Sequence, residues 1–309
     1  MVRVITAGHV NWDVTLGVDA LPDPDGEARI SSQRLSGGGS AANVAVAIVG
    51  YGADAAVVGS VGDDEPGFLA RRELDLAGVD VSALRTIRGR DTTVKYLVVD
   101  DAGQVMVLGN EGANEAFGAD EIDREALGTA DHLHLTSQRP ETARALAKKA
   151  RAGGTAVSFD PGRRIGERDY GDLLETVDVL LVNRREAAIA LDGGDPREAV
   201  AGTDRILAVK RGAEGAAVYA ADAVLEHPGF AVETVDTTGA GDAFAAGFLA
   251  VFVGALNGRD RSPRRAPDLE RALEVGNAAG ALSTRGVGAR TAPDRETLES
   301  FLAERADAE

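Results

Sequence analysis

Short runs of apolar residues alternate with longer apolar or amphipathic segments along most of the chain. The short runs predict buried strands at residues 2–7, 55–60, 133–136, 156–160, 177–182, 206–210 and 216–219. The longer segments predict helices at residues 41–50, 66–77, 140–152, 184–191, 241–253 and 269–283. Strands that alternate with helices are typical of a parallel sheet covered on both faces. The pattern therefore predicts an α/β fold with a doubly wound, mostly parallel sheet.

Two segments depart from this alternation. Residues 14–36 place single apolar positions between prolines and glycines, and residues 92–109 alternate apolar and polar positions around Tyr96. Both segments predict extra antiparallel strands, which we expect to form a small β lid on one large core that spans residues 1–309. Residues 256–267, rich in Arg, Asp and Pro, predict a loop, and residues 306–309 predict a frayed end.

The chain is strongly acidic. Its 309 residues carry a formal net charge of -17 with a pI of about 4.7. A negative average field repels polyanions, so we expect no nonspecific binding to nucleic acid or to anionic membranes. Only four lysines stand against 50 acidic residues. This balance is typical of halophilic proteins, in which a salt-rich cytoplasm screens the repulsion between surface carboxylates.

The composition also excludes several kinds of chemistry. The chain has no cysteine, which excludes disulfides, a thiolate nucleophile and cysteine metal sites. No apolar stretch approaches the roughly 20 residues of a membrane span, and the N-terminus enters a predicted strand without the pattern of a signal peptide. We therefore expect a cytoplasmic protein.

The most specific chemical signal lies at residues 235–244, where a strand-like segment meets an apolar helix. Gly239, Ala240 and Gly241 are small enough for backbone N–H groups to converge on an anion at the helix N-terminus. Asp242 would repel a resting anion. A carboxylate suits this position if the anion is a phosphoryl group in transfer and Asp242 takes the proton of the attacking hydroxyl. The alternative is a helix that begins with glycines for close packing and with an aspartate for its dipole.

Two motifs resemble signatures of the ribokinase family of carbohydrate kinases, which includes B-type phosphofructokinases and many nucleoside kinases. Residues 236–242 match its D-T-x-G-A-G-D signature and residues 38–43 its G-G-x-x-x-N signature, and the resemblance covers nearly the whole chain. It implies an ATP-dependent and Mg²⁺-dependent transfer of phosphate to a hydroxyl, expected to be primary, of a sugar or ribosyl compound. It also implies that the lid covers this acceptor and joins two subunits, so we expect a homodimer.

The acceptor residues are expected after the first strand and at the glycine-rich turn. Asp13 can accept hydrogen bonds from two adjacent hydroxyls, and Asn43 can both donate and accept. The resemblance implies that Asp13, Gly38 and Asn43 bind the sugar, with Asn11 and Gly39 beside them. The alternative is a glycine turn at a helix entry in which Asp13 is only a turn residue.

The nucleotide residues are expected in the second half of the chain. Asn183 and Glu186 resemble the family's N-x-x-E motif, whose carboxylate acts on Mg²⁺-bound water near the phosphates. Taken alone, the same pair is a helix capping box. Lys210, Gly212 and Gly215 resemble the segment that runs under the nucleotide. Lys210 then contacts the phosphates or, in the alternative, points to solvent.

Two more sites follow from the resemblance alone. Asn277 matches a position near the adenine pocket of the family. Asp236 and Thr238, together with the loop at residues 284–290, resemble the monovalent-cation site of potassium-activated members. A salt-rich cytoplasm would supply K⁺ to such a site, although Thr and Asp are also common at strand ends.

The motifs do not fix the acceptor. Ribose, a nucleoside, ribose 1-phosphate, fructose and 2-keto-3-deoxygluconate all fit them. Ribokinase carries a lysine followed by glycine where this chain has residues 39–41, Gly-Ser-Ala. Arg163, or its neighbour Arg164, can bind an anionic group of the substrate or lie on the surface. We therefore expect a ribosyl acceptor, with a nucleoside or ribose 1-phosphate ahead of free ribose.

Isolated aromatic and histidine positions carry weaker signals. His132 and His134 share one face of a predicted strand and offer two metal ligands without a third nearby, so we interpret them as packing residues. Trp12 can stack on a sugar or base, or pack at the end of the strand, which is the more common role.

Three rival functions can be weighed on the motifs. Residues 37–42 satisfy the relaxed fingerprint of an NAD(P)-dependent dehydrogenase, but a lid-like segment separates them from the first strand. No glycine is followed by lysine, so the chain has no P-loop. A catalytically silent sugar-binding regulator is disfavoured because every catalytic position of the resembled family is intact.

Overall fold

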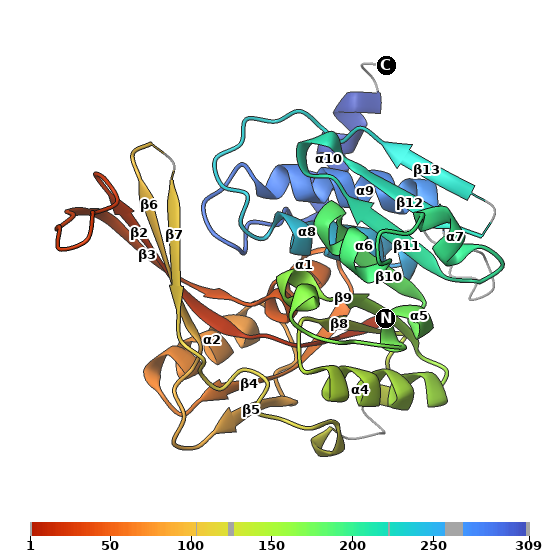
Figure 1. The fold of residues 1–309 in the computed structure, drawn as a ribbon, viewed down its shortest axis with the longest axis horizontal. Helices are drawn as coiled ribbons and strands as arrows, with labels where there is room; N and C mark the ends of the chain where they lie inside the picture. Colours follow the sequence, from red (N-terminus) through yellow and green to blue (C-terminus); the bar gives the residue numbers. More distant parts are fainter. Residues whose placement is uncertain (1, 103, 123–126, 222, 257–267, 307–309) are drawn as a thin grey trace.

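A nine-stranded sheet forms the centre of the computed structural model, with helices against both faces (Figure 1). The structure describes residues 2–102, 104–122, 127–221, 223–256 and 268–306. In spatial order, the strands are β13 (Ala223–His227), β12 (Ala216–Ala220), β11 (Ile206–Lys210), β10 (Val179–Asn183), β9 (Ala156–Asp160), β8 (His132–Thr136), β1 (Arg3–Ala7), β4 (Asp54–Gly62) and β5 (Leu84–Ile87). The strands from β11 to β5 pair in parallel, and β12 and β13 add antiparallel pairs at one edge.

Helices connect these strands and cover the sheet. They are α1 (Ser40–Gly50), α2 (Glu65–Leu76), α4 (Pro140–Ala152), α5 (Leu173–Thr176), α6 (Arg184–Ala190), α7 (Pro196–Val200), α8 (Ala240–Phe252), α9 (Leu269–Ser283) and α10 (Arg295–Ala306). Short 3-10 turns are η1 (Ala119–Glu121), η2 (Gly162–Gly166) and η3 (Gly212–Glu214). Successive side chains of β1 point to opposite faces of the sheet. Val4 packs in the core under α1, α8 and α9, and Ile5 packs in the core under α4. Burial on both faces explains why these strands are continuous apolar runs.

A second sheet of four strands projects from one side of the main sheet (Figure 1). Its order is β3 (Ile30–Gly38), β2 (Asn11–Val18), β6 (Val94–Asp100) and β7 (Val105–Gly109). The expected antiparallel pairing holds for the two outer pairs, whereas β2 and β6 pair in parallel. Strand β2 continues from β1, and β6 follows β5. Because β1 and β5 point the same way in the main sheet, the strands that leave their ends also run in the same direction.

The sequence predicted most of this architecture. Each predicted strand and helix is present, with bounds shifted by at most a few residues. The pattern did not predict β5, β13 and α10, nor the short helices α5 and α7. Strand β13 is an edge strand without a buried apolar run, and α10 buries only Leu298, Phe301 and Leu302. The predicted loop at 256–267 and the predicted frayed end lie almost wholly outside the described residues. In the part of the chain that is described, no helix has the length and apolar character needed to span a bilayer.

Candidate active site

The N-terminus of α8 has the backbone that the sequence predicts for an anion site. Gly239 precedes the helix with φ 80° and ψ -4°, a left-handed conformation, and a Cβ there would overlap the carbonyl of Ala289. The amide of Ala240 donates to the carbonyl of Thr237 at 3.2 Å. Within the described residues, the amides of Gly239, Gly241 and Asp242 donate to no acceptor. The helix therefore presents unpaired N–H groups where its dipole favours an anion.

Asp242 lies in the first turn of this helix. Its Oδ2 accepts a hydrogen bond of 2.8 Å from Nδ2 of Asn43. Burial raises the pKa of Asp242 to about 6, and the nearby charge of Asp160 adds to this effect, whereas Asn43, Lys210 and Lys95 oppose it. A carboxylate with this pKa is ionised at neutral pH and is a stronger base than an ordinary aspartate.

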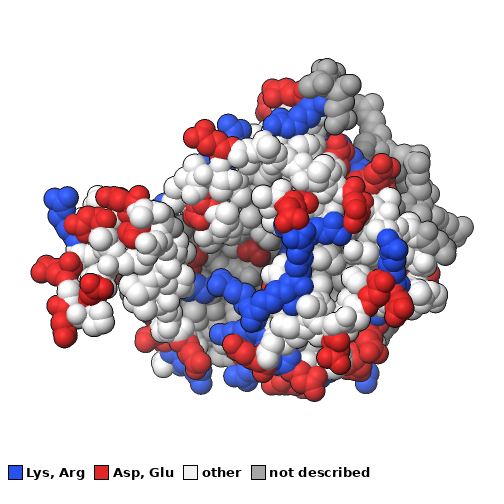
Figure 2. All heavy atoms as spheres, turned by 45° about the horizontal axis from the view of Figure 1, so that its top comes forward, with Lys and Arg blue, Asp and Glu red and all other residues white. Residues whose placement is uncertain are grey.

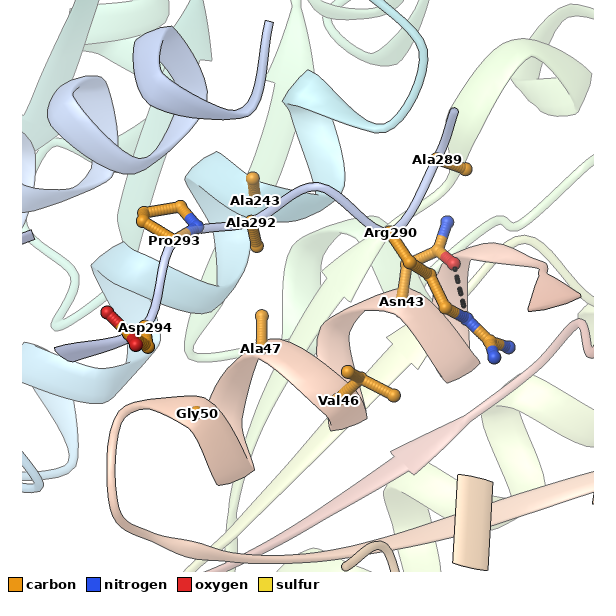
Figure 3. Close-up of a pocket in the computed structure, with 10 residues that line it drawn as sticks. All are labelled: Asn43, Val46, Ala47, Gly50, Ala243, Ala289, Arg290, Ala292, Pro293 and Asp294. Carbon is orange, nitrogen blue, oxygen red and sulfur yellow. Dashed lines mark hydrogen bonds between the residues drawn. The ribbon is translucent and has the colours of Figure 1, made fainter. Parts of the chain in front are cut away.

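Asn43 links Asp242 to a buried arginine. Its Oδ1 accepts a hydrogen bond of 3.3 Å from Nε of Arg290, whose guanidinium also donates to Glu73 at 2.8 Å and to the carbonyl of Gly38 at 3.3 Å. Figure 3 shows Asn43 and Arg290 bonded at one end of a cavity of about 120 Å³. The remaining lining comes from α1, the start of α8 and residues 289–294, so this cavity touches the candidate site only at its edge.

Three charged side chains converge at the carboxyl ends of neighbouring strands. Lys210, at the end of β11, donates to Oδ2 of Asp160, at the end of β9, over 2.5 Å. Burial opposes the charge of Lys210, but Asp160 and Glu186 prevail and raise its pKa. Burial and the charge of Asp160 in turn raise the pKa of Glu186. Lys210 Nζ also lies 3.5 Å from the position that a Cβ on Gly241 would take, so this cluster adjoins the α8 N-terminus.

Glu186 and Asn183 form the capping box that was the alternative interpretation of the N-x-x-E motif. The amide of Glu186 donates to Asn183 Oδ1 at 2.9 Å, and the amide of Asn183 donates to Glu186 Oε2 at 2.8 Å. The box fixes the carboxylate beside Asp160 and Lys210, so the capping and the nucleotide interpretations are compatible. The alternative of a solvent-exposed Lys210 is wrong.

The other predicted nucleotide residues come from η3 and from α9. Gly212 begins and Gly215 follows η3, directly after Lys210. Asn277 is buried in α9 and its Nδ2 donates back to the carbonyl of Leu273 at 2.8 Å. Its role near an adenine stays a prediction.

Asp236 ties two segments together near the start of α8. Its Oδ1 accepts from the amide of Thr238 and its Oδ2 from the amide of Gly288, both at 2.8 Å. Although burial opposes this effect, these backbone bonds lower the pKa of Asp236. The predicted cation residues are therefore brought together with the loop at 284–290, but their cation stays a prediction.

The predicted acceptor residues come from the four-stranded sheet, since Asn11 and Asp13 lie in β2 and Gly38 ends β3. A Cβ on Gly38 would overlap the carboxylate of Asp13, so only glycine allows this approach. Gly39 follows as the residue before α1. Asp13 Oδ1 and Asn11 Nδ2 are buried without a hydrogen-bond partner among the described residues. Such atoms are costly unless a ligand satisfies them.

Lys95 faces these residues from β6. It is the register partner of Asp13 in the parallel pair, so the two side chains share one face of the sheet. Burial raises the pKa of Asp13, whereas the charges of Lys95 and Arg290 oppose that rise. Lys95 makes no hydrogen bond or ion pair with the described residues, which leaves its ammonium group for a ligand.

A cluster of basic residues surrounds one buried carboxylate, Glu115. Nε2 of His9 lies 2.6 Å from it, and Arg168 donates to both of its oxygens at 2.9 and 3.0 Å. Arg164 and Arg139 approach it at 3.5 and 4.0 Å. Figure 2 shows Lys and Arg side chains gathered in the hollow between the four-stranded sheet and the main body. The predicted Arg163 is exposed and takes no part in the cluster.

The packing interpretation of the two strand histidines is confirmed. His132 Nε2 and His134 Nδ1 lie 2.7 and 2.8 Å from the same hydroxyl, that of Ser158. Burial lowers the pKa of both histidines to about 3, so they stay neutral inside the sheet. Trp12 is likewise part of the hydrophobic core.

Sequence reasoning missed several residues of the site. Asp160 carried a signal, since it ends the strand predicted at residues 156–160 and lies three residues before Arg163. Lys95 could have been singled out because lysine is so rare in the chain. Arg290 and Glu115 left no such signal, because each reaches the site from a loop distant in sequence.

Unpaired amides at a helix N-terminus, a basic aspartate beside them and a lysine between carboxylates at strand ends define a phosphotransferase. The chain belongs to the pfkB family of carbohydrate kinases, since the sequence model of that family matches residues 1–296. The glycine motif at 37–42 runs from the end of β3, a strand of the second sheet, into α1. It does not follow a strand of the parallel sheet, which argues against the dehydrogenase alternative.

Individual relatives agree with this class. The chain is 55% identical over 309 residues to an ATP-dependent ribose-1-phosphate kinase of Halopiger xanaduensis, with 99% of this chain and 100% of the relative covered. It is 27% identical to a nucleoside kinase of Methanocaldococcus jannaschii, covering 94% of this chain and 93% of that protein.

Solved structures show the same fold. The ribokinase of Thermotoga maritima has a TM-score of 0.83 at 26% identity, with 98% of this chain and 100% of that chain covered. The nucleoside kinase of M. jannaschii has a TM-score of 0.82 at 26% identity, with 98% and 99% covered. The predicted ribokinase-like fold is thereby confirmed.

Proposed function

We propose that this protein transfers the γ-phosphoryl group of ATP to the primary hydroxyl of ribose 1-phosphate. The observation that carries the transfer is the position of Asp242, a basic carboxylate beside unpaired amides at the α8 N-terminus. The choice of acceptor is supported by the likeness, over the full length of both chains, to a relative named as a ribose-1-phosphate kinase.

In the proposed reaction, Asp242 takes the proton of the acceptor hydroxyl. The hydroxyl oxygen then forms a bond to the γ-phosphorus, and the bond from that phosphorus to the bridging oxygen breaks, which releases ADP and the sugar bisphosphate. The amides of Gly239, Gly241 and Asp242 would stabilise the charge on the transferred group. Asn43 would hold Asp242 in place through its hydrogen bond of 2.8 Å.

The three charged residues at the strand ends, Lys210, Asp160 and Glu186, are here called the strand-end cluster. This cluster suits the nucleotide and its metal. Lys210 would bind phosphate oxygens next to α8, and Gly212, Gly215 and Asn277 would line the rest of the nucleotide. Glu186 and Asp160 offer carboxylate oxygens, the donors that Mg²⁺ prefers, and a role through water suits a metal that dehydrates reluctantly. Mg²⁺ bound there would neutralise phosphate charge.

The acceptor sugar would lie between β2 and α1. Asp13 Oδ1 and Asn11 Nδ2, both buried and without partners, would bond its ring hydroxyls. Gly38 and Gly39 would let the backbone approach the sugar, and Asn43 would reach it from α1.

We propose K⁺ as an activator and a KCl-rich cytoplasm as the setting. Asp236 and Thr238 join the loop at 284–290 to the segment that leads into α8, so a cation there would steady the anion site. Molar KCl would also screen the net charge of -17. Activity should be higher in KCl than in LiCl at equal ionic strength, and equal activities would contradict the site.

We also propose that two copies meet through the outer face of the four-stranded sheet. Leu35, Tyr96 and Leu108 are exposed and lie in register across three strands, on the face opposite Asp13 and Lys95. An exposed apolar patch of this kind marks an interface. Sedimentation should give a dimer for the wild type and a monomer for Tyr96→Asp. The control Val224→Asp, on the distant β13, should stay dimeric, and a monomeric wild type would contradict the interface.

Product analysis tests the proposed reaction directly. With ATP, Mg²⁺ and KCl, ribose 1-phosphate should give a bisphosphate whose new phosphorus signal couples to the protons of the primary carbon. Ribose, nucleosides, fructose and 2-keto-3-deoxygluconate should react more slowly. Faster turnover of any of these would replace the proposed acceptor.

A further inference from the structure

The cluster around Glu115 has more positive charge than its own carboxylate neutralises. Burial alone would raise the pKa of Glu115, but hydrogen bonds from His9 and Arg168 hold it at about 2, so the group is ionised at neutral pH. Burial lowers the pKa of His9, so its ring is neutral near pH 7 and contributes no charge. Three guanidinium groups thus meet one carboxylate, and two of their charges are left uncompensated.

The arginines of the cluster fall into two kinds. Arg168 is 18% exposed and its fork is fully engaged by both oxygens of Glu115. Arg164 and Arg139 are 45% and 54% exposed and touch Glu115 only at 3.5 and 4.0 Å. Most of their five donors therefore remain available. The ion pair of Arg168 with Glu115 is therefore held in place, whereas Arg164 and Arg139 are free to bind a ligand.

The cluster lies next to the predicted acceptor residues, because neighbours in the chain and hydrogen bonds connect the two groups. Asn114, the neighbour of Glu115, donates to Oδ1 of Asn11 at 2.5 Å and accepts from the amide of Val10 at 3.1 Å. His9, which contacts Glu115, directly precedes this segment. On the other side, Arg164 lies in η2, which follows Asp160 of the strand-end cluster. The basic cluster therefore lies between the two halves of the site.

The backbone conformation of Glu115 indicates that specific contacts hold the basic cluster in place. Its φ of 63° is in the left-handed region, which residues other than glycine rarely adopt. Such a conformation costs free energy and persists only where surrounding contacts hold it. Here the bonds of Glu115 with His9 and Arg168 hold it, and they orient the guanidinium groups around one point.

We propose that Arg164 and Arg139, positioned by Glu115 and Arg168, bind the phosphate group that the acceptor carries before the reaction. A phosphomonoester carries a charge of about -1.5 to -2 at pH 7, which matches the two uncompensated arginine charges. Planar guanidinium groups also suit phosphate oxygens because they can donate two parallel hydrogen bonds. The inference rests on the proposed function, and it assigns the residues that recognise the anionic group of the acceptor.

Arg163 provides a matched control. It neighbours Arg164 in η2, carries the same charge and is exposed, but it has no contact with Glu115. A general effect of positive charge on substrate attraction would appear in Arg163→Ala and in Arg164→Ala alike. A phosphate site would appear only in the second variant.

The experiment compares Arg163→Ala, Arg164→Ala, Arg139→Ala and the double variant Arg139→Ala/Arg164→Ala with the wild type. Calorimetry without ATP measures binding of ribose 1-phosphate and of ribose, and steady-state kinetics gives both KM values. Each single variant at 164 or 139 should bind ribose 1-phosphate about 10- to 100-fold more weakly, and the double variant weaker still. Ribose binding, the KM for ATP and the properties of Arg163→Ala should stay near those of the wild type.

The outcomes separate this inference from the proposed function. Wild-type binding of ribose 1-phosphate by Arg164→Ala and Arg139→Ala would overturn the phosphate site while leaving the reaction intact. Arg164-dependent binding without turnover by the wild type would support the phosphate site and refute the proposed reaction. Wild-type protein that neither binds nor phosphorylates ribose 1-phosphate would refute both.

Discussion

The two sides of the site satisfy their charges in different ways. On the strand-end side, Lys210 meets Asp160 at 2.5 Å and Glu186 is held in a capping box, so the groups are fixed before any ligand arrives. On the acceptor side, Asp13 and Asn11 each keep a buried polar atom without a partner among the described residues. A preorganised side suits the nucleotide that we propose for it. The unsatisfied side offers the polar atoms that would select the proposed acceptor.

The largest effect is expected at the junction of the two sides, from Asp242→Asn. Asparagine keeps the size of the side chain but cannot take a proton, so kcat should fall by about 10² to 10⁴. Binding of ATP, measured by calorimetry, should change little. A kcat within about threefold of the wild type would show that the base lies elsewhere.

A smaller and more selective loss is expected from Asp13→Ala. Removing a charged partner of the acceptor hydroxyls should lower kcat/KM for the acceptor by about 10- to 100-fold. The KM for ATP should stay constant, because Asp13 belongs to the four-stranded sheet and not to the strand ends. Equal weakening of both substrates would make Asp13 a structural residue and erase the division between the two sides.

The pH dependence of kcat should report the state of Asp242. Its pKa is raised to about 6, and only the ionised form can accept a proton. Lowering the pH through 6 should therefore lower kcat, by about tenfold for each further pH unit. The residual activity of Asp242→Asn should lack this step. A wild-type profile that is flat between pH 5 and 7 would be inconsistent with Asp242 as the base.

The smallest effect concerns stability. Because the folded-state pKa of Asp242 lies above the ordinary value of 3.8, its ionised carboxylate destabilises the folded protein above about pH 6. This cost disappears as the pH falls toward 3.8. Asp242→Asn should thus raise Tm by about 1 to 4 °C at pH 8. A lower Tm in the variant at that pH would mean that the carboxylate stabilises the fold.

The difference between the two sides also explains what the sequence could predict. Lys210, Glu186 and Asp242 stand at strand ends or at a helix start within motifs, and local pattern determines such positions. Glu115 and Arg290 come from loops, and only the tertiary fold brings them to Asn11 and Asn43. The sequence does not distinguish Arg163 from Arg164, because two adjacent arginines in a short turn give no indication of where each side chain points. The parallel pairing of β2 and β6 likewise depends on where β1 and β5 lie in the main sheet.

The proposed reaction and the proposed phosphate site both require that the acceptor side selects a phosphorylated sugar. The most direct measurement is the ratio of kcat/KM for ribose 1-phosphate to kcat/KM for ribose, both determined with saturating ATP in molar KCl. Charge-assisted bonds to a phosphate predict a ratio of about 100 or more in favour of ribose 1-phosphate. A ratio near one, or a preference for free ribose, would show that the site does not select the phosphate group.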